Sequence, residues 1–482
     1  MPDVKVVHLA SEVAPFSKTG GLADVTGSLP PALAEAGLDV TVISPWYRDS
    51  EQAAAGTRTI ARLRVSIPGH ETRFELRELC DRGVNWWFIV QPGLFDRGGI
   101  YGPPGADFPD NDTRYGLFCR AALAALADRD CEPDVVHCHD WQTGPACLLL
   151  RDRAVRGGPT VPGTVFTIHN LGYQGNFPAT SYDALGLQRE YFTPEWVEYF
   201  GKVSFLKAGL VAADRLTTVS PTYAREIQTE ELGFGMDPVL RHRSRVLSGI
   251  LNGIDTGYWN PATDRFLPAR FSAADPAGKQ ECKLALFRET GLTEPNRPLF
   301  GCVTRLADQK GVDLIVSSIP ALVAQGARFC VLGTGAPELH EALSGLQNRF
   351  PGSVAAILRF DEPLAHRVYA GSDFFLMPSR YEPCGLGQMI ALRYGALPVA
   401  TRTGGLADTV FDLKEDPARG NGLLCERDSL AGFRAALDRA LALFGTPAYG
   451  RARRRGMQTD FSWDARAREY ARLYDELVAA RD

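Results

Sequence analysis

Several features typical of membrane, secreted or redox proteins are missing from this sequence. No apolar run is long enough to span a bilayer, so we expect no membrane helix. The first residues show neither a basic segment followed by an apolar stretch nor an Arg- and Ser-rich one, so we expect no signal or transit peptide. The ten cysteines are scattered without a Cys-x-x-Cys pair, which favours reduced, mostly buried thiols in a cytoplasmic protein.

The sequence also has no strong excess of charge. Its formal net charge is −5, from 52 basic and 57 acidic residues, which gives no reason to expect nucleic acid or a membrane surface as a partner. Local basic residues would therefore have to hold any anionic ligand. The 45% hydrophobic and 23% charged residues are typical of a soluble globular protein. A length of 482 residues is too great for one core, so two domains are expected.

Two common nucleotide-binding signatures are absent as well. There is no P-loop of the form G-x-x-x-x-G-K-[ST]. The segment VLGTGAPE (331–338) contains G-x-G, but Glu338 stands where the dinucleotide fingerprint needs a third small residue. A dehydrogenase is therefore disfavoured.

Short apolar runs alternate with helical patterns along most of the chain. Strands are expected at 4–10, 39–45, 86–90, 134–139, 164–170 and 215–220, and then at 298–305, 327–335, 353–360, 373–379 and 397–401. This alternation predicts an α/β fold with parallel sheets covered by helices on both faces. It pauses in the Pro-, Gly- and Asp-rich segment 252–280, so we place a domain boundary near residue 255. The last residues, 461–482, predict a charged amphipathic helix.

The hexapeptide TGGLAD occurs twice, at 19–24 and at 403–408. In each copy two glycines would let the backbone approach a ligand, and a helix would begin whose dipole favours an anion. Ligands of doubly wound sheets lie beyond the carboxyl ends of the strands. We therefore interpret the copies as two halves of one ligand surface, the alternative being a coincidence between two Gly- and Ala-rich turns.

Charged residues follow two of the expected strands in the second half. Arg305 and Lys310 flank a loop that opens a helix, where two cations would suit a diphosphate; the alternative is a pair of solvated surface charges. Glu382 follows another strand, with Gly385 and Gly387 close by. Its carboxylate could accept hydrogen bonds from sugar hydroxyls or stabilise positive charge, or be an ordinary acidic residue at a helix start.

Histidines end two expected strands of the first half. His169 would stand at a strand end, and Asp140 could cap the helix after its strand. His137 and His139 would share one face of a strand, which invites a metal interpretation. No third ligand with sensible spacing follows, so we favour core packing for His137 and a cleft or structural role for His139.

Taken together, the motifs strongly resemble the bacterial glycogen synthase and plant starch synthase family of retaining glucosyltransferases. The likeness runs through almost the whole chain and is carried by SEVAPFSKTGGLADV, HDWQTG, TIHNLGYQG, ILNGIDTGYWNPATD, GKQECKLALFRETGL, TRLADQKGVDLI, MPSRYEPCGLGQ, ALRYGALPVATRTGGLADTV and FSWDARA. The resemblance implies two Rossmann-like domains facing a central cleft, the GT-B fold. The domains would be 1–255 on the acceptor side and 256–455 on the donor side, with a helix in 456–482 returning to the first.

The same resemblance implies transfer of glucose from ADP-glucose to the non-reducing end of an α-1,4-glucan such as glycogen, with retention. It implies neither metal nor pyridoxal phosphate. Lys18, Arg305 and Lys310 would hold the donor phosphates, and Glu382 and His169 would act beside the glucose. The remaining donor contacts would come from Gly20, Gly21, Asp24, Asn252, Cys384, Gly385, Leu386, Thr403, Gly404 and Gly405. Asp140, Trp141 and Tyr101 would line the acceptor side.

One position departs from the family pattern. Phe360 stands where the family usually has a tyrosine that stacks on adenine; the ring is kept and the phenol lost. Three rivals remain: a transferase of this fold with a sugar-phosphate acceptor, a phosphorylase with pyridoxal phosphate, and a non-catalytic glucan-binding protein. The sequence leaves four properties open: the choice between ADP-glucose and UDP-glucose as donor, the acceptor length, the oligomeric state and the regulation.

Overall fold

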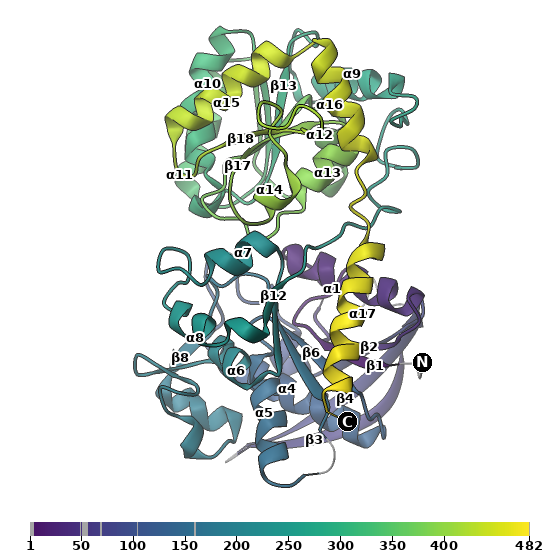
Figure 1. Cartoon of the computed structure of the whole chain (residues 1–482), viewed down its shortest axis with the longest axis vertical. Helices are drawn as coiled ribbons and strands as arrows, with labels where there is room; N and C mark the ends of the chain where they lie inside the picture. Colours follow the sequence, from purple (N-terminus) through teal and green to yellow (C-terminus); the bar gives the residue numbers. More distant parts are fainter. Residues whose placement is uncertain are drawn as a thin grey trace. The chain divides into compact units, whose positions relative to one another are not determined.

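The computed structural model describes residues 4–48, 50, 56–67, 70–103, 105–158 and 161–481. The chain divides into two compact units, each built around its own β-sheet (Figure 1). The first unit comprises Met1–Gly253 and Trp463–Asp482, and the second comprises Ile254–Ser462. The chain therefore crosses between the units twice.

The first unit is built on a nine-stranded sheet in the order β12-β11-β7-β6-β1-β2-β5-β4-β3. The strands are β1 (Lys5–Leu9), β2 (Asp39–Pro45), β3 (Arg58–Ile67), β4 (His70–Asp81), β5 (Val84–Val90), β6 (Val135–His139), β7 (Gly163–Ile168), β11 (Arg215–Thr218) and β12 (Leu247–Gly249). From β12 to β5 every pairing is parallel, as expected. The pairings of β4 with β3 and β5 are antiparallel, so the sheet is mixed at this edge.

Helices and a small second sheet complete the first unit. The longer helices are α1 (Gly21–Glu35), α4 (Asn111–Asp128), α5 (Gly144–Val155), α6 (Phe205–Ala212) and α17 (Trp463–Ala479), and the short ones are α3 (Pro92–Phe95), α7 (Pro221–Glu226) and α8 (Asp237–His242). The 3-10 turns are η1 (Ala179–Leu185), η2 (Arg189–Tyr191) and η3 (Ser244–Val246). β8 (Asn176–Pro178), β10 (Lys202–Ser204) and β9 (Glu198–Tyr199) form the three-stranded antiparallel sheet.

The final helix returns to the first unit. α17 packs beside α1 (Figure 1), and its apolar side is buried in the same core cluster as the first strands. The residues of α17 in this core are Trp463, Ala467, Tyr470, Tyr474 and Leu477. The preceding helix α16 (Pro447–Gln458) stays in the second unit, so only part of the segment 456–482 lies in the first.

The second unit contains a six-stranded sheet in the order β15-β14-β13-β16-β17-β18, with parallel pairings throughout. Its strands are β13 (Leu299–Val303), β14 (Arg328–Leu332), β15 (Val354–Ile357), β16 (Phe374–Met377), β17 (Leu397–Thr401) and β18 (Leu423–Cys425). Its other helices are α9 (Ala277–Thr290), η4 (Asp308–Lys310), α10 (Val312–Ala324), α11 (Pro337–Arg349), α12 (Glu362–Gly371), α13 (Gly387–Arg393), α14 (Gly404–Thr409) and α15 (Leu430–Leu443).

Both sheets reverse their strand order at one point. In the first unit the chain extends the sheet in opposite directions from β1 and β6, and in the second from β13 and β16. Loops that leave the carboxyl ends of such neighbouring strands diverge and leave room for a ligand. The two reversal points are therefore where functional side chains are expected.

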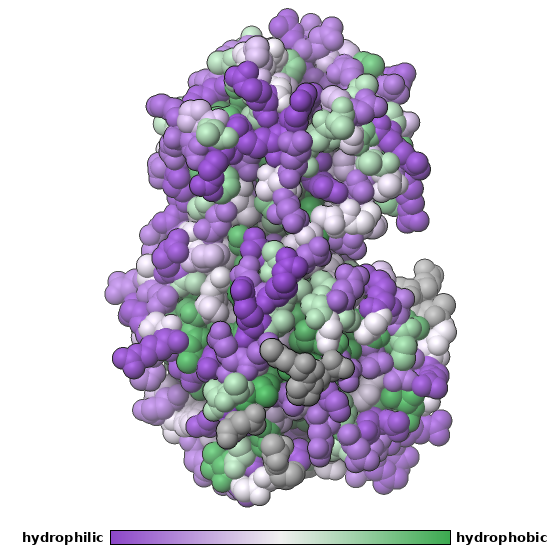
Figure 2. All heavy atoms as spheres, turned by 45° about the vertical axis from the view of Figure 1, so that its right-hand side comes forward, coloured by the Kyte–Doolittle hydropathy of each residue, from purple (hydrophilic) through white to green (hydrophobic). Residues whose placement is uncertain are grey.

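The face of the molecule drawn in Figure 2 is mixed in polarity. Hydrophilic residues predominate on the face drawn in Figure 2, with apolar ones in smaller groups between them. Among the described helices none is long and apolar enough to cross a bilayer. All ten cysteines are free thiols, and all but Cys80 and Cys131 are buried.

Candidate functional site

A buried carboxylate holds the loop between β1 and α1, which contains the first TGGLAD copy. Glu12 Oε2 accepts hydrogen bonds from the backbone N–H groups of Thr19, at 2.5 Å, and Gly20, at 3.3 Å. The hydroxyl of Tyr101 donates to Glu12 Oε1 at 2.7 Å. Burial raises the pKa of Glu12, whereas these hydrogen bonds lower it. Glu12 was missed by the sequence reasoning; its only signal was an acidic residue inside the apolar stretch SEVAPF.

The first TGGLAD copy begins α1, as predicted. Gly20 is the N-cap residue and Gly21 the first helical residue. The Gly20 N–H points to Glu12, so this amide serves the loop itself in the present structure. Lys18 Nζ lies 2.7 Å from Asp24 Oδ1, and both side chains are about one-third exposed. Lys18 and Asp24 thus form a solvent-accessible ion pair at the reversal point of the first sheet.

Asp140 does not cap α5, and that expectation is wrong. The N-cap of α5 is Thr143. Asp140 takes a left-handed conformation (φ 56°), and its Oδ1 accepts the backbone N–H of His169 at 2.7 Å. The side chain therefore ties the loop after β6 to the loop after β7 instead of reaching its own helix. Burial raises the pKa of Asp140 to about 7, because two backbone donors only partly offset its desolvation.

The other first-unit candidates are largely buried. Trp141 is 9% exposed, and its ring packs against Tyr115, Phe177 and Phe205. The Tyr101 hydroxyl is occupied by Glu12 and Ser11. Asn252 is 7% exposed, and its buried Oδ1 makes no hydrogen bond with the residues that the structure describes. This amide oxygen could accept a hydrogen bond from a ligand.

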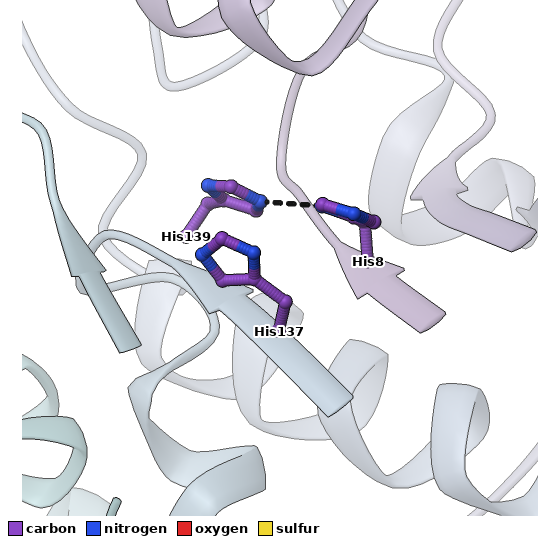
Figure 3. A group of neighbouring side chains, drawn as sticks. All are labelled: His8, His137 and His139. Carbon is purple, nitrogen blue, oxygen red and sulfur yellow. Dashed lines mark hydrogen bonds between the residues drawn. The ribbon is translucent and has the colours of Figure 1, made fainter. Parts of the chain in front are cut away.

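A third histidine does accompany His137 and His139, contrary to the sequence analysis. His8 on β1 lies beside them, and ligand atoms of the three rings lie within 4.8 Å of one another (Figure 3). Parallel pairing of β1 with β6 puts His8 directly opposite His137. The spacing of residues within one segment could not reveal this contact, because it depends on which strands are neighbours. The ring nitrogens of His137 bond to Tyr474 and Thr167, which agrees with the expected core packing.

In the second unit the structure brings Lys310 and Glu382 together. Lys310 ends η4 after β13, and Glu382 lies between β16 and α13, so both follow strands at the reversal point. Lys310 Nζ lies 2.8 Å and 2.6 Å from the two carboxylate oxygens, and the Ser379 hydroxyl donates to Oε2 at 2.9 Å. The side chains are 18% and 6% exposed, respectively. Arg305, on the same loop as Lys310, is exposed.

The second TGGLAD copy packs its glycines against the loop that carries Glu382. Thr403 is the N-cap of α14, and Gly404 has φ 43°. A Cβ on Gly404 would lie 1.9 Å from the Glu382 carbonyl oxygen, and one on Gly405 would lie 2.1 Å from that of Cys384. The Gly405 N–H donates to the Glu382 carbonyl at 3.1 Å. These glycines therefore allow two backbone segments to meet, which fixes the turn holding Glu382.

The remaining second-unit candidates lie around that turn and at the end of β15. Gly385 has φ 72°, and Leu386 is the N-cap of α13. Phe360 lies between β15 and α12 and is 76% exposed, so a ring face is accessible to solvent. An exposed aromatic face can stack on a planar base.

Comparisons with known proteins identify the family of the chain. Residues 5–242 match the family model of the starch synthase catalytic domain, and residues 297–442 match that of glycosyl transferases group 1. The chain is 47% identical over 481 residues to a glycogen synthase of Myxococcus xanthus, covering 99% of this chain and 100% of that one. It is 44% identical to glycogen synthase 2 of Geobacter sulfurreducens, with 98% of both chains covered.

Solved structures extend the likeness to the fold. The catalytic domain of starch synthase IV from Arabidopsis thaliana, bound to ADP and acarbose, superposes with a TM-score of 0.93 at 38% identity, covering 99% of this chain and 100% of that one. A sucrose-phosphate synthase of Thermosynechococcus elongatus matches with a TM-score of 0.60 at 19% identity, a likeness of fold alone. The two parallel α/β units are those of the GT-B fold. With matches over its full length, the chain belongs to the glycogen synthase and starch synthase family of glycosyltransferases.

Proposed function

We propose that this protein is a retaining glucosyltransferase that transfers glucose from ADP-glucose to the non-reducing end of an α-1,4-glucan such as glycogen. The observation that carries the proposal is the contact between Lys310 and Glu382 at the reversal point of the second sheet. A cation that would suit a diphosphate lies there beside a carboxylate that would suit a sugar hydroxyl, which supports the proposal. The full-length similarity to glycogen synthases supports the same activity.

The chemistry follows from the charges that develop as the bond from glucose to phosphate breaks. Negative charge grows on the leaving ADP and positive charge on the sugar. Arg305 and Lys310, joined by Lys18 from the first unit, would stabilise the diphosphate, because fixed cations act strongly where water is excluded. Lys310 would then exchange its contact with Glu382 for a phosphate. This exchange would release the Glu382 carboxylate to bind a glucose hydroxyl near the developing positive charge.

The proposed donor site includes both TGGLAD copies. Gly21 and the Gly404–Gly405 turn would lie along the diphosphate and the sugar, and Asp24 and Asn252 would contact donor groups from the first unit. Phe360 would stack on the adenine. The neighbouring Cys384, Gly385, Leu386 and Thr403 would complete the donor side.

On the acceptor side we propose Asp140, Trp141 and Tyr101, with His169 beside the transferred glucose. None of the site carboxylates stands as an obvious nucleophile, so we favour attack on the face from which the leaving group departs. Protein cations would take the role that a metal has in other transferases, and no pyridoxal phosphate is needed. The proposed place of action is the cytoplasm, which suits ten free thiols.

A donor screen tests the proposal. Purified protein is incubated with glycogen and either ADP-glucose or UDP-glucose, and the released nucleotide and the incorporated glucose are measured. We expect ADP release matched by glucan elongation. Transfer to glucose 1-phosphate instead of glycogen, a bound chromophore typical of pyridoxal phosphate, or glycogen binding without turnover would each replace the proposal with one of its rivals.

A further inference from the structure

Three histidines on neighbouring strands form a continuous chain of hydrogen bonds. His8 Nδ1 lies 3.0 Å from His139 Nε2, and His139 Nδ1 lies 2.9 Å from His169 Nε2. His8 and His139 are fully buried, and His169 is 9% exposed. Figure 3 shows the first of these contacts, with the ring of His137 alongside.

This chain of hydrogen bonds runs diagonally across the sheet toward the edge formed by the carboxyl ends of the strands. The register pairs His8 with His137, so His139 lies two residues further along its strand. His139 is in turn paired with Thr167, and His169 again lies two residues further along. A shift of two residues keeps each side chain on the same face of the sheet. The three rings therefore connect the interior of the first unit with His169, directly after β7.

The three imidazoles are held in their neutral form. Burial lowers the pKa of His8 and of His169 to about 3, and it lowers the pKa of His139 well below its usual value. A neutral imidazole has one nitrogen that donates and one that accepts. Because both nitrogens of His139 make a hydrogen bond within the histidine chain, the bonds can all donate only toward His169 or only toward His8.

His8, at the interior end of the hydrogen-bond chain, decides between these two directions of donation. His8 Nε2 is buried and makes no hydrogen bond in the described part of the chain. If the bonds ran from His169 toward His8, this nitrogen would carry a buried N–H without an acceptor. If they run from His8 toward His169, it carries only a lone pair, which is the less costly arrangement. His8 and His139 then donate from Nδ1, and His169 accepts at Nε2.

We infer that His8 and His139 are positioning residues that fix the ring of His169 with its proton on Nδ1, so that His169 offers a hydrogen-bond donor to the sugar. The catalytic part of this inference rests on the proposed function, whereas the proton placement does not. His137 serves as a matched control. It is equally buried, and its ring lies 4.2 Å from that of His139. Its nitrogens, however, bond to Tyr474 and Thr167, which are not part of the histidine hydrogen-bond chain.

The proton placement can be measured without substrate. The sequence has eight histidines, so 15N-histidine labelling gives few signals, which single substitutions assign. We expect His8, His139 and His169 of the unliganded protein to be neutral at pH 7, with the proton on Nδ1. A proton on Nε2 of His169 would overturn the inference, as would zinc bound in a one-to-one ratio in the purified protein.

Activity measurements then test the positioning role. His8→Leu removes the first donor, and we expect kcat for glucan elongation to fall about tenfold, with little change in KM. His8→Asn keeps an N–H near the place of Nδ1 and should restore most of the rate. His137→Leu should leave the His169 signal unchanged and kcat much less affected. Equal losses of kcat in His8→Leu and His137→Leu, or no rescue by asparagine, would overturn the positioning role.

Discussion

At the scale of single residues, the ion pair Lys310–Glu382 opposes the role that we propose for it, because donor binding would have to break the contact. Each charge stabilises the other while the site is empty, since both side chains are largely shielded from water. A ligand phosphate would compete with Glu382 for the same ammonium group. The resting contact would therefore be part of the cost of the proposed donor binding, and removing one partner has a different effect from removing both.

Substitutions in this pair should separate stability from activity. Lys310→Met leaves a buried carboxylate without its cation, so we expect unfolding free energy to fall by about 2 kcal/mol or more and turnover by about 100-fold or more. The double variant with Glu382→Gln should recover most of the stability and none of the turnover. Chemical denaturation and initial rates measure the two effects.

A similar pair away from the proposed site provides the control. Lys283 Nζ lies 2.6 Å from Asp373 Oδ2, with comparable burial, so Lys283→Met should destabilise the protein and leave kcat unchanged. Arg305→Ala, at an exposed residue, should lower turnover with little effect on stability. Near-normal turnover in both Lys310→Met and Arg305→Ala would remove the diphosphate assignment.

Asp140 predicts a dependence of stability on pH. Its folded-state pKa of about 7 lies above the unfolded value of about 3.9, so its contribution to stability is present at low pH and is lost as the pH rises from 4 through 7. Asp140→Asn keeps an oxygen acceptor for the His169 N–H without the charge. We therefore expect its Tm, relative to the wild type, to increase between pH 4 and pH 8.

Asp110 should show the opposite trend. Its hydrogen bonds to Arg97 lower the pKa of the carboxyl group, so the stabilisation is present above the unfolded pKa and is lost in acid. The Tm of Asp110→Asn, relative to the wild type, should therefore be lowest near neutral pH and should recover as the pH falls from about 5 toward the lowered folded pKa, where the wild-type carboxylate becomes protonated. Parallel trends in the two variants would contradict the assignment for Asp140.

At the scale of elements, the strands found from the sequence are those buried on both faces. All the expected strands are present, because parallel strands covered by helices are continuous apolar runs. β3 and β4 were not predicted, because charged residues alternate along them at the sheet edge and interrupt any apolar run. β18 and the strands of the small sheet have only two or three residues each, too few for a periodic signal.

The loop after β1 shows the same limit for the site. Its TGGLAD motif was visible, but the residue that shapes it was not, since Glu12 reaches Thr19 and Gly20 only after the loop has folded. Glycines of both TGGLAD copies make contacts within their own unit. Motif spacing could indicate where the loops are, whereas the partners of each amide depend on tertiary structure.

Replacing Glu12 should loosen this loop. Glu12→Ala frees the two loop amides and the Tyr101 hydroxyl, so we expect KM for the nucleotide sugar to rise about tenfold, since an unordered loop must be ordered on binding. Steady-state kinetics with varied donor measures this change. Thr26→Val removes a hydrogen bond to the Glu12 carbonyl but keeps the carboxylate, and it should lower stability with little change in KM. A larger donor KM in Thr26→Val than in Glu12→Ala would contradict the anchoring role.

At the scale of the whole molecule, the buried histidines make the first unit sensitive to acid. The pKa values of His8 and His169 are lowered to about 3, and those of His137 and His139 also lie well below 6.5. Their stabilisation is complete above the unfolded pKa and is lost as the pH falls below about 6.5, by up to about 1.4 kcal/mol per pH unit for each histidine.

Tryptophan fluorescence can follow this loss. The first unit holds Trp46, Trp86, Trp87, Trp141, Trp196 and Trp463, so a Trp259→Phe background reports on it alone. We expect the denaturant midpoint to fall from pH 7 to pH 5, and to fall less steeply when His8→Asn removes one titrating ring. A midpoint that is constant over this range would rule out the neutral buried state of these histidines.

The position of α17 also affects how the protein forms on the ribosome. The second unit consists of one continuous segment, residues 254–462, so it can fold as soon as this segment has left the ribosome, while synthesis continues. The first unit is begun earlier but lacks Trp463–Asp482, and the surface later covered by α17 stays open to solvent or to chaperones until α17 has been synthesised. The half of the enzyme made first is thus the half completed last, and a stop codon before Trp463 would leave it unfinished.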